Sequence, residues 1–367
     1  MDASEIEVKR MAAHKKRVRY GYMMAIFCAI FWGIWYVPGT FAWEFQPMVD
    51  FWEWSIIRFD GNEDTTRIVV GILITALNAA FVMLSYFIWN AFLGKNKFKE
   101  MWRSVREIKA CTKYYFLGAV CGGPIAILGS FMAMGVGGGA FAAVAALAYP
   151  VIGTILSRFW LGQKISHRAI AGILIILLGC FAIYGMGLIS DLQAGGSMMG
   201  YVGGIMALCG WGVEGAIAAR GIDVSEPDIA ITMRFGMESI IWFIIILPIL
   251  AIFSIPIWQY AWEMLTDPVI LLTLVMLGIT FGFCYVAWYK AFPLIGVGRG
   301  QGIGSLYGLC AIIFVFLFFG TLGTEPVWLV IGAILCTAGT LFMFTEKTEN
   351  VEQLRDSGEE NMGRDKQ

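Results

Sequence analysis

The sequence GYMMAIFCAIFWG occupies residues 21–33, and the sequence GYVGGIMALCGWG occupies residues 200–212. Both segments begin with Gly-Tyr and end with Trp-Gly at the same spacing, and Ile26 also matches Ile205. Each segment is almost entirely apolar and starts a longer apolar stretch. We interpret the pair as an internal repeat, a feature worth testing first because a missed repeat misassigns the whole fold.

The composition indicates a membrane protein. Of the 367 residues, 59% are apolar and 14% are charged, whereas soluble domains average about 45–50% and about 25% respectively. A soluble chain of this length could not bury so much apolar surface. The formal net charge of −1 says little about partners, because the charges gather at the two chain ends and in short connections. We expect the lipid bilayer as a partner and no nucleic acid.

Cysteine and histidine usage predicts neither a disulfide framework nor a metal site. All eight cysteines except Cys111 lie inside apolar stretches, so no pair is expected in an outer loop. His14 and His167 both lie beside basic segments. Zinc binding and histidine-based catalysis within the membrane are therefore not expected, and no cofactor is predicted.

The apolar stretches predict an all-α membrane protein with ten transmembrane helices. A spanning helix needs about 20 mostly apolar residues to cross a hydrocarbon core of about 30 Å. The first stretch follows a basic arm, as in a signal peptide, but it is too long and lacks a small-residue cleavage site, so we expect it to be retained. The expected spans lie at about residues 21–41, 68–93, 114–134, 141–161, 169–189, 200–219, 230–253, 269–292, 301–319 and 327–344.

These spans divide into two units of five. Residues 21–189 form the first unit, with an outer-loop insertion at 42–67, and residues 200–344 form the second. Residues 1–20 form a basic arm. Residues 345–367 form a polar, acidic-leaning tail that has too few apolar residues to build a core and is expected to be disordered.

Lysine and arginine set the expected orientation, because they gather in cytoplasmic connections. Six lie between Lys9 and Arg19, and seven lie between residues 95 and 113. The opposite side carries only Arg58 and Arg67. Both termini are therefore expected in the cytoplasm, in a multi-pass protein of a bacterial plasma membrane. With this topology the first span runs outward and the sixth runs inward, so the two repeats would be inverted.

A second match supports the repeat. The sequence GVGGG at residues 135–139 joins the third and fourth spans, and GVGRG at residues 296–300 joins the eighth and ninth. The offset between the halves falls from 179 residues at the first match to 161 at this one, which we attribute to the insertion in the first outer loop. Coincidence is the alternative explanation for matches this short.

Four short segments carry a resemblance to a known family: Phe31-Trp32-Gly33, Tyr149-Pro150, the turn Leu161 to Lys164, and Tyr285 to Ala291. With these segments and its expected topology, the sequence resembles the drug/metabolite transporter superfamily in its ten-helix EamA-type form. The resemblance covers about residues 21–344 and implies a transporter of small metabolites built from two five-helix repeats. Members usually carry a glutamate where this chain has Gln163, and the first outer loop is longer than usual, which suggests an outer cap or lid.

Three charged residues lie inside expected spans, where charges persist if they are paired or used. Glu214 lies in the sixth span, and Arg234 and Glu238 share one face of the seventh at a four-residue spacing. Glu214 and Arg234 are predicted to pair across neighbouring helices, either as a structural salt bridge or with a gating or substrate-contact role. Glu238 lies one turn deeper and is the better candidate for a proton or sodium coupling site.

Aromatic residues form two stripes at helical spacing. Trp32, Trp35 and Tyr36 make one stripe, and Tyr285, Trp288 and Tyr289 make the other. Under the repeat, Trp35 corresponds to Glu214, so an aromatic wall would face a carboxylate. Because aromatic faces attract cations, by about 0.5–2 kcal/mol each, this pattern predicts a cationic amine or choline-like solute. The alternative is an interfacial belt, which we assign to Trp43, Trp52, Trp54, Trp258 and Trp262.

Polar side chains at similar depth either bond to a neighbouring helix or line a wet cavity. Asn78, Gln301 and Tyr307 are candidates for the cavity, as is Trp211 of the repeated motif. Glycines such as Gly122, by contrast, are predicted to mark close contacts between helices.

Transport by alternating access is the function that these patterns favour, because a repeat of this kind places its substrate site between the two halves. A membrane-embedded enzyme is the rival class, but no catalytic constellation, metal-ligand spacing or phosphate-binding loop is found. A channel or a structural membrane protein is the other alternative. The solute itself, the direction of transport and the oligomeric state cannot be read from these residues.

Overall fold

The computed structural model describes residues 3–93, 98–107, 109–160, 166–193, 197–222, 226–323 and 326–344. The turn at 161–164 and the tail at 345–367 therefore lie outside the described residues. The described residues form helices joined by short turns, with no strand among them, as predicted for an all-α protein. In chain order the elements, with π-helical turns labelled η, are α1 (Ala3–Glu44), α2 (Met48–Arg58), α3 (Glu63–Ile88), η1 (Trp89–Leu93), α4 (Phe98–Glu107), α5 (Lys109–Val120), η2 (Cys121–Ile127), α6 (Leu128–Ala145), α7 (Tyr149–Trp160), α8 (His167–Cys180), η3 (Phe181–Gly187), α9 (Leu188–Gln193), α10 (Met199–Ile222), α11 (Pro227–Ile240), η4 (Ile241–Ile246), α12 (Leu247–Ile252), α13 (Ile257–Thr266), α14 (Pro268–Ile295), α15 (Val297–Gly304), α16 (Tyr307–Phe319) and α17 (Pro326–Phe344).

In the described part of the chain, nine helical stretches are long and apolar enough to cross a membrane. The protein is therefore an integral, multi-pass membrane protein. The nine stretches are Ala12–Glu44, Glu63–Ala91, Thr112–Ala145, His167–Gln193, Met199–Ala218, Pro227–Ile252, Pro268–Ile295, Arg299–Phe319 and Pro326–Met343.

The fourth expected span, at residues 141–161, differs from the expectation of one continuous helix. Its residues are shared between the end of α6 and the short helix α7, with a turn at residues 146–148 between them. Pro150 explains the break, because proline has no backbone N–H and disfavours helical geometry at the residue before it. A similar break separates α15 from α16 at residues 305–306.

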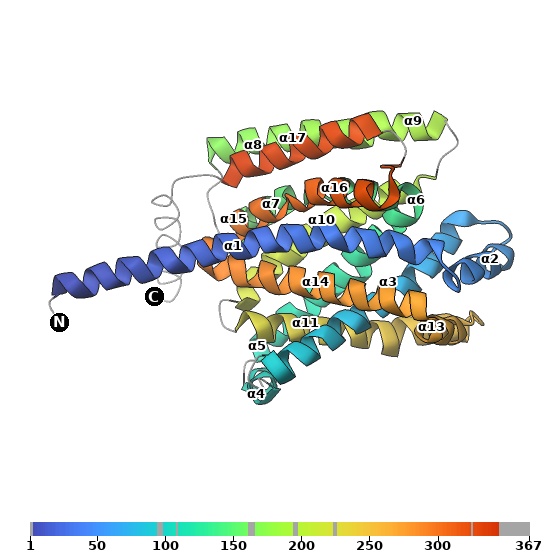
Figure 1. Cartoon of the computed structure of the whole chain (residues 1–367), viewed down its shortest axis with the longest axis horizontal. Coiled ribbons are helices and arrows are strands. Elements are labelled where there is room, and N and C mark those ends of the chain that lie inside the picture. Colours follow the sequence, from blue (N-terminus) through green and yellow to red (C-terminus); the bar gives the residue numbers. More distant parts are fainter. Residues whose placement is uncertain are drawn as a thin grey trace.

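The long helix α1 crosses the middle of the bundle (Figure 1). It packs on α14 and α16, whereas α10 packs on η2, α6 and α7. The antiparallel pair α8 and α17 forms one edge of the bundle, and α2 and α13 lie at the end opposite the start of α1 (Figure 1). The start of α1 and the end of α17 lie at the same end of the bundle (Figure 1).

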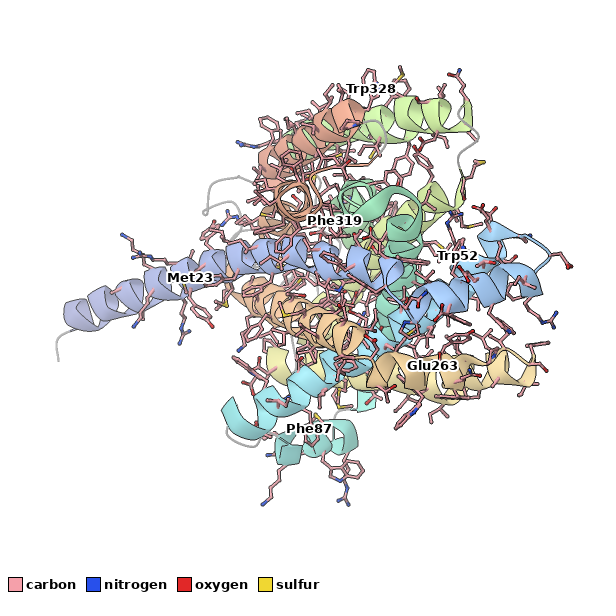
Figure 2. The ribbon with its side chains drawn as sticks, turned by 45° about the vertical axis from the view of Figure 1, so that its right-hand side comes forward. Met23, Trp52, Phe87, Glu263, Phe319 and Trp328 are labelled. Carbon is pink, nitrogen blue, oxygen red and sulfur yellow. The ribbon has the colours of Figure 1, made fainter. Side chains whose placement is uncertain are left out.

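Large apolar side chains cover the outside of the bundle (Figure 2). Met23 is 44% exposed and Phe87 is 53% exposed, both on helices that could cross a membrane. In water such exposure would be unfavourable. In a bilayer these side chains face lipid, and the polar backbone groups are satisfied within the helices.

Glycines allow the closest helix contacts. A β-carbon on Gly129 of α6 would lie 2.5 Å from the carbonyl oxygen of Gly203 of α10. In the same way, a β-carbon on Gly172 of α8 would lie 2.7 Å from the carbonyl oxygen of Gly339 of α17. Neither distance is compatible with a side chain, so these helices touch backbone to backbone, as small residues permit in membranes.

The glycines of the two matched segments make equivalent contacts in the two halves. A β-carbon on Gly21 would collide with the end of α14, and one on Gly200 would collide with residues around the turn in α6. Likewise, Gly33 lies against α16 and Gly212 lies against α7. The predicted repeat would place these two pairs of contacts at matching positions.

The backbone angles pair the two glycine-rich turns, at residues 135–139 and 296–300, differently from the match found in the sequence. Gly138 has φ 76° and ψ 178°, and Gly296 has φ 82° and ψ 153°. These similar values pair Gly138 with Gly296, three residues away from the predicted pairing of Gly135 with Gly296. Both positions need glycine, because a β-carbon disfavours positive φ. The corrected alignment pairs Tyr149 with Tyr307, the first residues of α7 and α16.

The close contact of α8 with α17 generates a test. Gly172→Ala should lower the melting temperature, because the added methyl group meets the backbone of α17. This loss should exceed the gain of about 0.5–1 kcal/mol that alanine brings to a helix interior. Gly236→Ala is the matched control, since the nearest atom to its β-carbon would be 3.7 Å away, and it should leave the melting temperature unchanged or raise it. Equal effects of the two substitutions would contradict the proposed contact.

Candidate functional site

Arg234 of α11 lies between two carboxylates in the interior of the bundle. Its Nε donates to Oε1 of Glu214 on α10 at 2.7 Å, and its Nη1 donates to Oε2 of Glu238, one turn further along α11. All three residues are fully buried. We name Glu214, Arg234 and Glu238 the ion triad.

Hydrogen bonds fix the carboxylates of the triad. The hydroxyl of Tyr285 donates to Oε2 of Glu214 at 2.9 Å, and the indole N–H of Trp211 donates to the Tyr285 oxygen at 2.9 Å. The indole N–H of Trp242 donates to Oε1 of Glu238 at 3.3 Å. These bonds connect the triad to α14 and orient both carboxylates toward Arg234.

Two glycines of η2 make room for the triad. A β-carbon on Gly122 would overlap Arg234 and Glu214, and one on Gly123 would overlap the carboxyl group of Glu238. Both glycines lie in a π-helical turn that also contains Pro124, and such turns occur where proline interrupts the regular hydrogen bonds. The sequence assigned Gly122 to a helix contact and missed Gly123. The structure places both against the charged groups.

The charges of the triad do not balance. When ionised, its two carboxylates and one guanidinium carry one net negative charge in a region closed to water. An uncompensated charge in such a place is unfavourable. A proton or a bound cation would neutralise it.

The two predicted aromatic stripes face each other across the centre of the bundle. Trp32 lies 5.7 Å from Trp288 and 6.1 Å from Tyr285, measured between ring centroids. It also stacks on Tyr307 at 4.4 Å and meets Trp211 edge-on at 4.8 Å. We name the rings in contact with Trp32 the aromatic cluster, which comprises Tyr149, Trp211, Phe281, Tyr285, Trp288 and Tyr307.

Trp35 and its partners lie to one side of Trp32. The indole N–H of Trp35 donates to Oδ1 of Asn78 at 3.1 Å, and its ring stacks on Phe281 at 4.3 Å. Trp35 therefore contacts α3 and α14, whereas the repeat predicted that it would face Glu214. The adjacent Tyr36 stacks on Tyr307 at 5.9 Å.

Tyr149 is a member of the cluster that the sequence did not assign to the site. Its hydroxyl donates to the backbone oxygen of Gln301 at 3.0 Å, and its ring lies 6.3 Å from Tyr307. The first residues of α7 and α16 therefore meet at the cluster. The corrected repeat alignment, which pairs these two tyrosines, is the signal that could have identified Tyr149.

The predicted cavity is closed in this conformation. Each of the twelve predicted site residues is at most 2% exposed. They lie in the interior of the bundle, where the aromatic rings among them contact one another. The twelve are Trp32, Trp35, Tyr36, Asn78, Trp211, Glu214, Glu238, Tyr285, Trp288, Tyr289, Gln301 and Tyr307.

A cavity of about 410 Å³ lies at the end of α1, beneath helix α2, and we name it the outer cavity after the predicted orientation. Its lining includes Trp43, Glu44 and Arg67, and also Thr40 and Met134. Thr40 lies one helical turn from Tyr36, and Met134 lies one turn from Ser130. The sequence assigned Trp43 and Trp52 to an interfacial belt, and the structure places both in this lining.

Several buried polar atoms at the centre have no hydrogen-bond partner among the residues that the structure describes. Leaving a buried donor or acceptor unpaired costs about 1–3 kcal/mol, and such groups call for an explanation. The atoms are Trp288 Nε1, Asn78 Nδ2, Arg234 Nη2 and Gln301 Nε2. Trp32 Nε1 and the hydroxyls of Ser130 and Tyr307, by contrast, lie around the Tyr36 hydroxyl, where these groups can pair with one another. As for metals, the described residues contain no group of three or more His, Cys, Asp or Glu side chains arranged to hold an ion.

Removal of the central cation generates a second test. Arg234→Met should destabilise the protein by about 3–5 kcal/mol, because two buried carboxylates lose their partner. The triple variant Glu214→Gln/Arg234→Met/Glu238→Gln, which has no charge left to bury, should recover much of that loss. Thermal unfolding in detergent measures both variants. A triple variant no more stable than Arg234→Met alone would show that charge burial is not the cause.

Comparison with known proteins identifies a family that part of this chain resembles. Residues 67–185 match the model of the EamA-like transporter family. A search of the curated proteins finds none that matches this chain. One solved structure is similar to this chain, and it is described only as a crystal structure of a protein. The two chains are 14% identical, and the match covers 88% of this chain and 95% of the other, with a TM-score of 0.48. The family match confirms the predicted resemblance over these residues, and this part of the chain is similar to the EamA-like transporter family.

Proposed function

We propose that this protein is a secondary transporter that carries a small polar metabolite with a cationic amine across a bacterial plasma membrane by alternating access. The observation that carries the proposal is the ion triad packed against the aromatic cluster at the centre of the bundle. Intramembrane ionisable residues mark functional sites by default. Here they lie beside aromatic faces, which attract cations.

The equivalent glycine contacts of the two halves support an arrangement of inverted repeats. In such transporters the substrate site lies near the bilayer midplane between the repeats, and one half rocks against the other around it. Trp32 belongs to the first half, and the triad belongs to the second. Movement between the halves would therefore separate Trp32 from the triad and open the closed centre.

The outer cavity supports a route to this centre. Its floor, formed by Thr40 and Met134, lies one helical turn outside Tyr36. A rearrangement of the side chains within that turn would connect the cavity to the aromatic cluster. The cytoplasmic position of both termini is part of the proposal, and it makes this cavity face the outside.

The net negative charge of the triad supports coupling to a proton or a sodium ion. With Glu238 neutralised, Arg234 and Glu214 form a balanced pair. With Glu238 ionised, the site attracts a cationic solute. The coupling ion and the solute would then compete for the negative charge of Glu238. Such competition would allow the protein to exchange one for the other across the membrane.

Flux through reconstituted protein separates this proposal from its rivals. Uptake of a labelled solute into proteoliposomes should saturate with concentration and should be competed by related amines. Linear, unselective flux would indicate a channel. Chemical conversion of the solute would indicate an enzyme.

A ligand panel tests the predicted solute class. Small cations, zwitterions, anions and nucleosides would each be tested for thermal stabilisation of the purified protein, because a ligand at 100 times its dissociation constant adds about 2.7 kcal/mol. Amine-bearing compounds should stabilise it. Stabilisation by anions or nucleosides without any by amines would refute a cationic solute.

The coupling proposal predicts the effect of one further substitution. Glu238→Gln keeps an acceptor for Trp242 and Arg234 but removes the charge, so it should abolish the proton dependence of transport and leave folding intact. The measurement is the uptake rate across a pH series, with the melting temperature alongside. Glu263→Gln, in the outer helix α13, is the matched control and should retain the wild-type pH profile. Unchanged pH dependence in Glu238→Gln would count against coupling at this residue.

A further inference from the structure

The outer cavity lies within residues 21–189, the predicted first half of the chain. Its described lining comes from α1, α2, α3 and α6 and includes no residue of the second half. The cavity is therefore separate from the central site, where the two halves meet. Its volume of about 410 Å³ falls in the range of small-molecule pockets, which is about 300–1,000 Å³.

Helix α2 forms the roof of the cavity and is supported from its other side. Phe51 of α2 is fully buried and packs against Tyr260 of α13, with the ring centroids 4.6 Å apart. Met48, Val49 and Trp52 of the same helix line the cavity. The packing of Phe51 therefore holds these three side chains over a space that is already formed.

Two tryptophans form adjoining walls of the cavity. The ring centroids of Trp43 and Trp52 lie 6.3 Å apart, and their planes meet at 72°. The guanidinium of Arg67 already lies 5.1 Å from the centre of the Trp52 ring. Such a contact is attractive because the face of an aromatic ring is negative, most strongly in tryptophan. Within the described ranges, no lysine or arginine lies over the Trp43 ring.

One carboxylate of the lining has no partner. Arg67 donates from Nη1 to Glu63 at 3.2 Å and from Nε to the backbone oxygen of Gly135 at 3.4 Å, so its charge is balanced. Glu44, by contrast, lines the cavity and makes no hydrogen bond or ion pair with any residue that the structure describes. The unbalanced charge at the cavity is therefore the negative charge of Glu44.

A second polar group of the lining also has no partner. The indole N–H of Trp43 is buried and meets no acceptor in the described part of the chain. It needs a lone pair, which an uncharged hydroxyl supplies as well as an anion does. A hydroxyl avoids the repulsion that Glu44 would exert on a second negative charge.

We infer that the outer cavity is itself a binding site, and that it takes a small organic ammonium compound. The ammonium group lies beside Glu44 and Trp43, and its apolar substituents lie against Val49 and Trp52. Opposite charge and aromatic faces both favour a cation here, whereas an anion would meet Glu44. Binding rests on the residues of the cavity alone, and only delivery of the ligand to the centre rests on the proposed function.

A cysteine in the lining measures the charge of the cavity. Val49→Cys supplies the thiol, and the protein without it gives the background; Val136→Cys, on the opposite wall, replaces it if the melting temperature falls. The rates with a cationic and an anionic methanethiosulfonate are each divided by the rate with a small free thiol. The corrected ratio should favour the cation. Glu44→Gln should lower this ratio about tenfold, because the two reagents respond to a nearby charge in opposite directions.

Glu53→Gln is the matched control for this measurement. Glu53 is an exposed carboxylate on the same helix as Val49, but it is not part of the lining. Its substitution should change the ratio by less than about twofold, since water and salt screen a charge outside the cavity. A ratio that Glu44→Gln leaves unchanged, or one that favours the anionic reagent, would overturn the inference.

A matched pair of compounds tests binding. Choline is compared with 3,3-dimethylbutan-1-ol, in which a carbon atom replaces the ammonium nitrogen and the hydroxyl is retained. Both are tested for protection of Val49→Cys against an uncharged maleimide. Choline should protect at a concentration about tenfold lower than the alcohol, and Glu44→Gln should remove most of this difference. Equal protection by the two compounds, or no protection by choline, would overturn the inference.

Uptake of labelled amines into proteoliposomes separates this inference from the proposed function. Protection by choline without saturable uptake of any amine would retain the cavity site and reject amine transport. Saturable uptake of an amine without protection by choline would retain transport and reject the cavity site.

Discussion

The pairing of Arg234 with Glu214 and Glu238 is the interaction on which the rest of the interior depends. Three charges at this depth are tolerable only when each has a partner, because lipid and tightly packed side chains offer them no solvation. Tyr285 and Trp242 restrict the carboxylates, and Gly122 and Gly123 leave the space that the side chains occupy. The triad thereby connects η2, α10, α11 and α14 through one set of contacts.

The aromatic cluster contacts this charged centre through Tyr285, to which Trp211 is hydrogen-bonded. Trp32 reaches it from α1, and Tyr149 and Tyr307 reach it from the first residues of two short helices. Breaks in transmembrane helices are tolerated only where other groups satisfy the freed backbone, and here both breaks lie beside the cluster. The packing that closes the site thus includes two interruptions of regular helix.

Much of this arrangement could be predicted from sequence, because periodicity and charge carry local information. The four-residue spacing of Arg234 and Glu238 predicted a shared face, and the depth of Glu214 predicted its pairing. The two aromatic stripes followed from the helical spacing of their residues. The role of Gly123 and the interruption before Tyr149 did not, since both depend on contacts between distant segments. The sequence match paired Gly135 with Gly296 because the letters GVG occur in both turns. The positive φ angles instead pair Gly138 with Gly296, three residues away.

The central claim is that the closed centre opens to water on each side of the membrane in turn. Cys28 tests it most directly, because it is fully buried on α1, and a β-carbon on Gly304 would lie 3.8 Å from both its sulfur and the Trp288 ring. In a variant whose other cysteines are replaced, the measurement is the rate at which a membrane-impermeant thiol reagent labels Cys28 from each face of sealed vesicles during transport. The account predicts labelling from both faces, slowed by the transported solute. A Cys28 that stays unreactive from both faces while uptake proceeds would contradict it.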